Sequence, residues 1–196
     1  LTINTEGHTA IGIDIELSEV TVALADLMGN ISEREVFPTP EDPAELVQAI
    51  GRKVNRMVAA SRREGTQHVG VAVSGLVDHE TGTILTASNL GWTNFPLGPK
   101  LQKRLNGAGL LDNEGNLCAL AEIWHGDFSD RSCPDLVFVN VKEGIGTGLV
   151  IGGQIYRGFA SLAAEFGHMI IQRDGPQCGC GNRGCWETLA GPTAII

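Results

Sequence analysis

The chain has 196 residues, 42% of them hydrophobic, and a formal net charge of −9. It can therefore bury a substantial core, in one large domain or two small ones, and its composition excludes a disordered polypeptide. Its apolar runs, such as Leu136–Val141, are far too short to cross a bilayer. Nucleic-acid-binding surfaces need clustered lysine and arginine. The densest basic cluster, from Arg52 to Arg63, has helical periodicity and is best explained as a solvated helix face.

Two further features concern location. The chain opens with Leu1-Thr2-Ile3-Asn4, without a basic region followed by an apolar segment, so a cytoplasmic protein is expected. Three of the five cysteines lie within Cys178–Cys185, a spacing typical of a metal site rather than of a disulfide framework.

In the first part of the chain, apolar β-rich runs separated by polar turns predict three antiparallel strands, followed by an amphipathic helix capped by Asp42. The expected elements are strands at 10–15, 20–26 and 31–36, a helix ending before Gly65, a strand at 68–73, a hairpin at 78–88, a helix at 97–105 and a strand at 109–112.

The later part repeats the opening pattern. The sequence predicts a helix at 116–125, a strand at 135–141, a glycine-rich turn at 144–148, a strand at 149–151, a turn at 152–153 and a strand at 154–156. Two strand–turn–strand–turn–strand units suggest two α/β lobes, at 1–118 and 119–196, with a ligand cleft between them. The last residues, Ala194-Ile195-Ile196, resemble the start of a helix, so the chain is expected to be a fragment.

The most specific local signal is Cys178-Gly179-Cys180-Gly181-Asn182-Arg183-Gly184-Cys185. Its glycines allow the backbone to fold back, so that the three sulfurs can converge on one point. His168 is the only nearby histidine and would complete a tetrahedral structural zinc site. Free or redox-active thiols are the alternative. A catalytic zinc is disfavoured because no coordination position would stay open.

These residues resemble the signature of the ROK family, which comprises repressors, open reading frames and sugar kinases. The resemblance rests on Glu165-Phe166-Gly167-His168 and on Cys178–Glu187, and it extends to segments in family order at 12–14, 74–78, 89–92, 112–114 and 144–153. It implies an actin-like ATPase (ribonuclease-H-like) fold of two α/β lobes, without the family's C-terminal helices.

The resemblance also implies a sugar pocket. A carboxylate suits a sugar because it accepts hydrogen bonds from neighbouring hydroxyls. Glu165 and His168 would share one face of a helical turn, and Glu187 would be positioned by the same zinc. In isolation, Glu165 could be a surface residue and Glu187 a helix N-terminal carboxylate. The family pattern adds four residues to the expected sugar contacts: Asn113 and Glu114, and less firmly Gly75 and Asn89.

Two departures favour a sugar sensor over a sugar kinase. The glycine turn of the family's kinases is replaced here by Asp14–Val20, where Glu16 and Glu19 add negative charge. A carboxylate about 4 Å from a phosphate costs about 1 kcal/mol in water and about 4 near a protein surface. Glu114 stands where the kinases have a catalytic aspartate, so no catalytic residue is expected. The pair Asn113-Glu114 resembles the family's xylose-repressor-like regulators.

Some features leave other functions open. The glycines at 144–148 and 152–153 could cradle phosphates, as in an ATP-dependent sugar kinase. A structural or assembly protein on an actin-like scaffold is a third possibility. The favoured interpretation implies a monosaccharide effector, structural zinc, no ATP, no membrane, a homo-oligomer, and DNA binding only through a winged helix-turn-helix ahead of residue 1.

Overall fold

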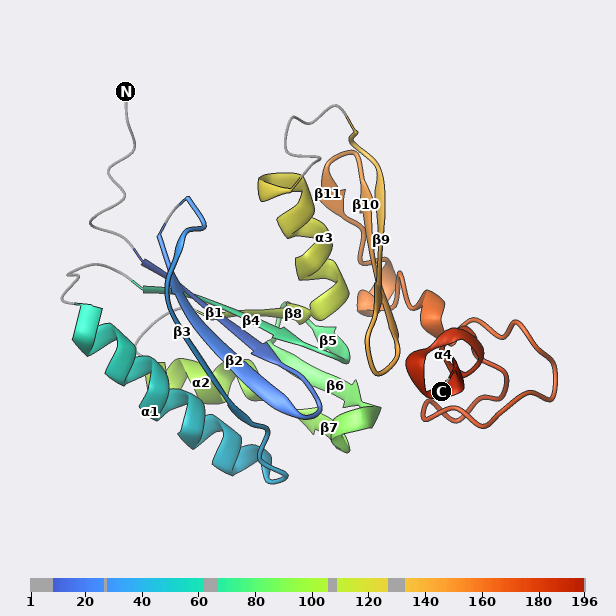
Figure 1. Ribbon diagram of the computed structural model, residues 1–196, viewed down its shortest axis with the longest axis horizontal. Helices are drawn as coiled ribbons and strands as arrows, with labels where there is room; N and C mark the ends of the chain where they lie inside the picture. Colours follow the sequence, from blue (N-terminus) through green and yellow to red (C-terminus); the bar gives the residue numbers. More distant parts are fainter. Residues whose placement is uncertain (1–8, 27, 62–66, 106–108, 127–132, 196) are drawn as a thin grey trace. The chain divides into compact units, whose positions relative to one another are not determined.

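The computed structural model describes residues 9–26, 28–61, 67–105, 109–126 and 133–195 (Figure 1). Contacts divide the chain into two compact units, Leu1–Asp112 and Asn113–Ile196. The division falls where strand β8 (Gly109–Asn113) gives way to helix α3 (Glu114–His125), whereas the lobe boundary was predicted after residue 118, inside that helix. Among the residues described, no helix is both long enough and apolar enough to cross a membrane.

The first unit is built on a five-stranded sheet with the order β3-β2-β1-β4-β8. Strand β1 pairs antiparallel with β2 and parallel with β4, and β2 pairs antiparallel with β3, which confirms the predicted opening meander. Alternate residues of β1 and β2 point into the core, as expected for a sheet with one buried face. The strands are β1 Thr9–Ile15, β2 Glu19–Ala25, β3 Ile31–Pro38, β4 Gln67–Val73 and β8 Gly109–Asn113.

Two helices also contribute to this core, α1 (Pro43–Ser61) and α2 (Leu97–Leu105). Asp42 caps α1 as predicted, since its Oδ1 accepts a hydrogen bond of 2.8 Å from the Ala44 amide. The buried residues of α1 recur at helical spacing and belong to the same core cluster as the sheet residues.

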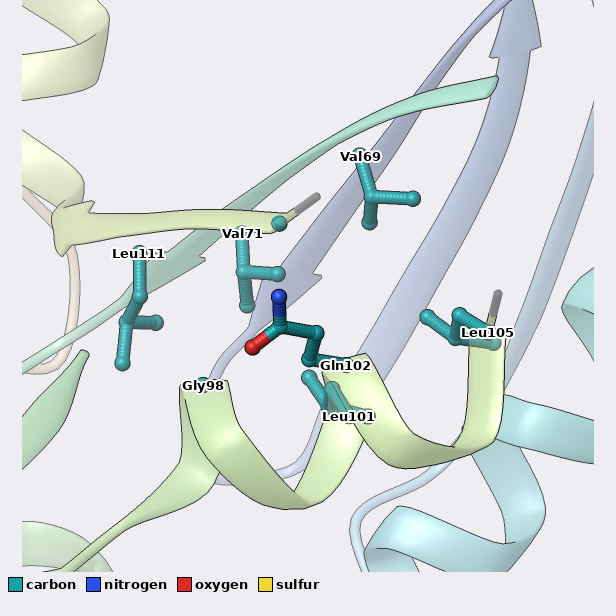
Figure 2. Close-up of a pocket in the computed structure, with 8 residues that line it drawn as sticks. Val69, Val71, Gly98, Leu101, Gln102, Leu105 and Leu111 are labelled. Carbon is teal, nitrogen blue, oxygen red and sulfur yellow. The ribbon is translucent and has the colours of Figure 1, made fainter. Parts of the chain in front are cut away.

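A second small sheet accompanies α2. Strands β5 (Leu76–Asp78) and β6 (Thr83–Ala87) form the predicted hairpin, and β7 (Trp92–Phe95), which was not predicted, pairs with β6 after the short 3₁₀ helix η1 (Ser88–Leu90). Figure 2 shows a small pocket in this unit, lined by residues of β4, β8 and α2. Its lining is apolar except for Gln102, so it offers little to a polar ligand.

The second unit packs helix α3 (Glu114–His125) against a three-stranded antiparallel sheet with the order β11-β10-β9. The strands are β9 Leu136–Val141, β10 Ile145–Ile151 and β11 Gln154–Ile155. Ala119 and Ile123 of α3 form a core with Val150, and three partly buried residues pack around it: Leu136, Phe138 and Ile155. The sheet repeats the meander of β1, β2 and β3, as the sequence indicated.

The predicted glycine-rich turn at 144–148 is wrong. Strand β10 already begins at Ile145, and the bend between β9 and β10 occupies residues 142–144. The reason is that Gly148 serves helix packing: a Cβ atom there would lie 2.1 Å from the carbonyl oxygen of Gly115. A glycine within a strand commonly marks such a close backbone approach.

The remainder of the second unit has little regular structure. It contains the 3₁₀ helices η2 (Phe159–Ser161) and η3 (Phe166–His168) and the short helices α4 (Trp186–Ala190) and α5 (Pro192–Ile195). Within η2 and in the segment between η2 and η3, the backbone takes left-handed conformations at three residues other than glycine: Ala160, Ser161 and Ala164.

Candidate functional site

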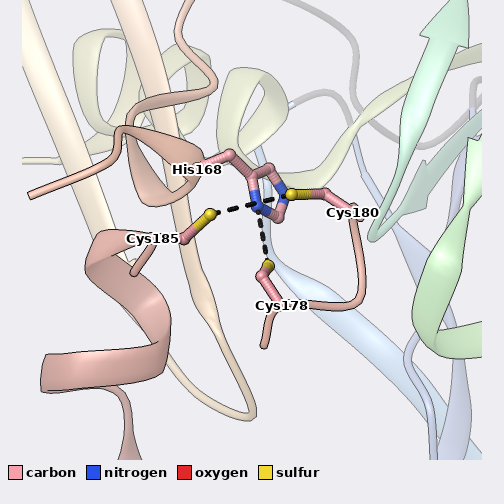
Figure 3. Close-up of side chains that lie close together, drawn as sticks. All are labelled: His168, Cys178, Cys180 and Cys185. Carbon is pink, nitrogen blue, oxygen red and sulfur yellow. Dashed lines mark hydrogen bonds between the residues drawn. The ribbon is translucent and has the colours of Figure 1, made fainter. Parts of the chain in front are cut away.

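His168 and three cysteines converge on one point (Figure 3). Their ligand atoms all lie within 4.8 Å of one another. The Nδ1 atom of His168 is 3.6 Å from the Sγ of Cys178, and the sulfurs of Cys180 and Cys185 are 3.7 Å apart. A tetrahedron with Zn–S of about 2.3 Å and Zn–N of about 2.0–2.1 Å has edges of about 3.6 and 3.8 Å. The four residues predicted from their spacing therefore form a cluster that fits a tetrahedral metal ion.

The local backbone explains this convergence. The Cys178 amide donates to the Asn182 carbonyl at 2.9 Å, and the Gly181 amide donates back to the Cys178 carbonyl at 3.1 Å. Gly181 and Gly184 have φ of 96° and 69°, a region that L-residues with side chains rarely adopt. A Cβ atom at Gly184 would also lie 1.7 Å from the Gln172 carbonyl oxygen. The backbone conformation therefore favours glycine at 181, and at 184 both the conformation and the lack of space for a side chain require it.

Glu187 lies directly beside the cluster. Its Oε1 atom is 2.9 Å from the Cys178 sulfur and 3.3 Å from His168 Nδ1. Burial, together with the hydrogen bond to Glu187, raises the pKa of the Cys178 thiol. A metal ion must therefore displace a proton from this cysteine, and metal uptake should weaken as the pH falls.

The other nitrogen of His168 faces one of the predicted sugar residues, Glu165. Nε2 lies 4.0 Å from the Oε2 atom of Glu165, and both side chains are about one-third exposed. The two residues share a single 3₁₀ turn, in which the His168 amide donates to the Glu165 carbonyl at 3.1 Å. Burial raises the pKa of the Glu165 carboxyl; His168 opposes this shift and Glu187 adds to it. The turn thus directs one imidazole nitrogen to the thiols and the other to Glu165.

Thr147 forms hydrogen bonds with the backbone on both sides of Glu165. Its hydroxyl donates a hydrogen bond to the carbonyl of Ala164 and accepts one from the amide of Phe166 at 3.2 Å. The Thr147 side chain is buried on strand β10. Thr147 could not be identified from the sequence, because a contact across 17 or 19 positions leaves no local signal.

Asn113 and Glu114 stand at the start of α3. Asn113 is the N-cap of this helix, and its Oδ1 accepts from the amides of Gly115 at 2.8 Å and Asn116 at 3.4 Å. The Oε1 atom of Glu114 accepts from Asn140 Nδ2 at 2.8 Å and from Lys142 Nζ at 2.7 Å. The Glu114 side chain is only 10% exposed.

Asn140 and Lys142 were also not predicted, although the sequence contains a signal for Asn140. Along β9 the partly buried positions alternate with exposed ones, and Asn140 follows Leu136 and Phe138 on the side packed against α3. A polar residue on the buried side of a strand calls for a hydrogen-bond partner. The partner, Glu114, could not be identified without the fold.

The two less firm sugar candidates, Gly75 and Asn89, belong to the first unit. Gly75 has no room for a side chain, since a Cβ atom would lie 2.7 Å from the Thr86 carbonyl oxygen. Asn89 is exposed in η1. The other five predicted sugar residues, Asn113, Glu114, Glu165, His168 and Glu187, all lie in the second unit.

Comparison with known proteins agrees with this combination of two α/β units and a Cys/His cluster beside carboxylates. The model of the ROK family matches residues 10–196, and the chain belongs to this family. A xylose repressor from Caldicellulosiruptor bescii is 32% identical over an alignment of 200 residues that covers 100% of this chain and 50% of the repressor. A glucokinase from Streptomyces coelicolor is 31% identical over 191 residues, 95% of this chain and 57% of the kinase.

Solved structures include the same two classes. A ROK glucokinase from Streptomyces griseus, crystallised with glucose and AMPPNP, has a TM-score of 0.85 and 32% identity, covering 95% of this chain and 58% of its own. A ROK transcriptional regulator described as a homolog of the E. coli MLC protein has a TM-score of 0.86 and 26% identity. The match covers 99% of this chain and 49% of the regulator. The actin-like ATPase fold is thereby confirmed. The chain spans about half the length of the repressors that it matches.

Proposed function

We propose that this chain is the sugar-sensing, effector-binding part of a ROK-family transcriptional regulator, which binds a monosaccharide without phosphorylating it. The main support for the proposal is the environment of Glu114: its Oε1 atom accepts hydrogen bonds from both Asn140 and Lys142. In this proposal the Cys/His cluster holds a structural zinc, and another segment of the protein binds operator DNA and represses transcription.

The environment of Glu114 suits binding better than proton transfer. A general base has to reach the proton that it removes, and an error of about 1 Å can cost about 100-fold in rate. Glu114 is one methylene longer than the aspartate expected of a kinase, and two N–H donors fix one of its oxygens. A carboxylate fixed in this way can still accept a hydrogen bond from a sugar hydroxyl.

The turn after β1 supports the same conclusion. The Glu16 amide donates to the Glu19 carbonyl at 3.0 Å, which closes the turn between β1 and β2, and Thr39 donates its hydroxyl to the Glu16 carbonyl at 2.7 Å. The turn carries two carboxylates and no glycine. Both properties disfavour the close approach of ATP phosphates.

Glu165 and His168 suggest how a sugar is held. If the metal takes His168 Nδ1, then Nε2 carries the hydrogen and can donate it. A hydroxyl placed between Nε2 and Glu165 Oε2, which are 4.0 Å apart, could accept from the imidazole and donate to the carboxylate. Glu187, whose side chain is 20% exposed, would add a further acceptor. The metal in this scheme orients the ring and performs no chemistry.

An ATP-dependent sugar kinase is the second candidate, supported by the glucokinases among the relatives. The two candidates share sugar binding and differ in phosphoryl transfer. A structural or assembly protein of the same fold would bind no sugar.

The test is calorimetric titration of the full-length protein with common aldoses and amino sugars. One of them should bind, and Glu165→Ala should weaken that binding by at least about tenfold, since a charged hydrogen bond contributes about 1.5–3 kcal/mol. Glu143→Ala, at an exposed carboxylate of the β9–β10 bend, is the matched control and should bind as the parent does. Equal affinity of Glu165→Ala and the parent would contradict the proposed site.

A further inference from the structure

Three carboxylates of the proposed sugar site come from separate segments of the second unit. Glu114 begins α3, Glu165 precedes η3, and Glu187 lies in α4. Glu114 bonds to Lys142, the carboxylate of Glu187 occupies the space that a side chain on Gly144 would need, and the peptide groups on either side of Glu165 bond to Thr147. Lys142, Gly144 and Thr147 belong to one short stretch, 142–147, which comprises the bend between β9 and β10 and the start of β10. We propose that this stretch, the bend together with the start of β10, is the positioning element of the sugar site, acting through Lys142, Gly144 and Thr147. The inference rests on the proposed sugar-binding function.

Lys142 acts on Glu114. Its Nζ lies 2.7 Å from Glu114 Oε1, and the lysine side chain is 41% exposed while the carboxylate is 10% exposed. The lysine therefore directs a nearly buried carboxylate from its solvent side. The Lys142 amide also donates to the Gly144 carbonyl at 3.1 Å, so the backbone of the bend fixes where the lysine begins.

Gly144 acts on Glu187 by leaving space. A Cβ atom on Gly144 would lie 2.7 Å from Glu187 Oε2 and 3.7 Å from its carboxyl carbon. The carboxylate thus occupies the space that a side chain at 144 would need. Because the obstructed atoms are the end of a flexible side chain, an alanine would move the carboxylate rather than disrupt the fold.

Thr147 acts on Glu165 through the backbone. Its hydroxyl bonds to the carbonyl before Glu165 and to the amide after it. The residue before Glu165, Ala164, has a left-handed φ of 64°, which carries a steric cost for alanine. A buried hydroxyl that pairs with both neighbouring peptide groups can hold this conformation in place.

The proposal is tested in the full-length protein with the sugar identified by titration. Lys142→Ala and Gly144→Ala should each weaken binding by about tenfold, the effect of losing one well-placed hydrogen bond. Their melting temperatures should stay within about 2 °C of the parent, because neither change removes buried apolar contacts. Lys142→Arg should retain affinity within about threefold, because it keeps the charge and the donors.

Matched controls come from the same stretch. A Cβ atom on Gly146 would meet no atom within 4 Å, so Gly146→Ala should bind like the parent. Glu143→Gln changes an exposed charge of the bend and should also be neutral. Lys142→Ala should have less effect in a Glu114→Gln background than in the parent, because the lysine is argued to act through that carboxylate.

Thr147 needs a paired test because its hydroxyl also satisfies buried peptide groups. Thr147→Val should lose both sugar affinity and some stability, whereas Thr147→Ser should restore both, since only the hydroxyl is needed. Parent-like affinity of both Lys142→Ala and Gly144→Ala, with Glu165→Ala still defective, would overturn the inference and leave the proposed function intact. A parent protein that binds no sugar would overturn both.

Discussion

Gly148 of strand β10 and Gly115 of helix α3 approach so closely that a side chain at either position would collide with backbone. A Cβ atom on Gly148 would lie 2.1 Å from the Gly115 carbonyl oxygen, and one on Gly115 would lie 2.4 Å from the Thr147 carbonyl oxygen. Helix and strand therefore pack backbone to backbone at the end of α3 that carries Glu114. This contact fixes the distance between α3 and the sheet beneath it.

The first prediction concerns this contact. Gly148→Ala should destabilise the protein by about 1–3 kcal/mol, because neither backbone can retreat easily from an overpacked site. Gly146→Ala, two residues earlier on the same strand, meets open space and should change the free energy of unfolding by no more than about 0.5 kcal/mol. Urea denaturation followed by circular dichroism measures both. Equal stability of the two variants would show that α3 does not pack on β10 as described.

The second prediction concerns the metal. Protein purified without chelator should contain about one zinc per chain, because three thiolates and one imidazole complete a structural tetrahedral site. Cys180→Ser should lower the zinc content and the melting temperature, since metal binding and local folding are coupled. Cys133→Ser is the control: this cysteine lies outside the cluster and donates to the Asp135 carbonyl, which serine can also do.

Elemental analysis of the parent protein and of Cys180→Ser measures their zinc content. A zinc content well below half an equivalent in the parent, or an undiminished content in Cys180→Ser, would rule out the tetrahedral site.

A third prediction concerns the acid side of the stability curve. Hydrogen bonds from Lys53 and then Arg56 lower the pKa of Glu35, and they tie strand β3 to helix α1. Because this folded-state pKa is depressed, the stabilisation is present above the unfolded pKa of about 4.3 and is lost as the pH falls through the folded value. Glu35→Gln should cost no more than about 1 kcal/mol at pH 7, as is usual for pairs at the surface.

Below the folded-state pKa of Glu35, parent and variant should become equally stable. Denaturation curves at pH 7 and at pH 3 measure the difference. A stability gap that stays constant between these two values would show that the carboxylate charge is not its source.

The fourth prediction separates the two candidate functions. The full-length protein should show no sugar-dependent release of ADP from ATP, because phosphoryl transfer depends on positioning and charge stabilisation and both are compromised. Turnover in the usual kinase range of about 1–100 s⁻¹ would defeat the sensor proposal. Glu114→Asp alone should not create a kinase, since the turn after Asp14 would still lack its glycines. If it did, that turn must accept ATP after all.

Much of the fold could be predicted because its signals are local. Helix α2 was placed at its observed ends, and the two meanders follow from apolar runs separated by turns. The error at 144–148 arose because glycine has two uses that sequence cannot separate: it permits a turn, and it permits close packing. At Gly148 the second use applies, and its cause is Gly115, far away in the chain.

The candidate site likewise contains residues that the sequence could predict and residues that it could not. The Cys/His cluster could be predicted because its three cysteines lie within eight residues and its histidine lies ten residues before them. The roles of Asn140, Lys142 and Thr147 could not, since each depends on a contact between distant segments. For Asn113 a sugar contact stays a prediction; what the structure adds is that its side-chain oxygen caps α3, a role that fits its position before the helix.

The left-handed residues of η2 and of the segment that follows it restrict which side chains this stretch can accept. Ala160, Ser161 and Ala164 have φ between 54° and 64°, where β-branched side chains are strongly disfavoured and glycine or asparagine is readily accommodated. A library randomised at these three codons and sorted for soluble expression should therefore be enriched in glycine, asparagine and aspartate. Valine, isoleucine and threonine should disappear from it, even at Ser161, where the side chain itself is not fully buried.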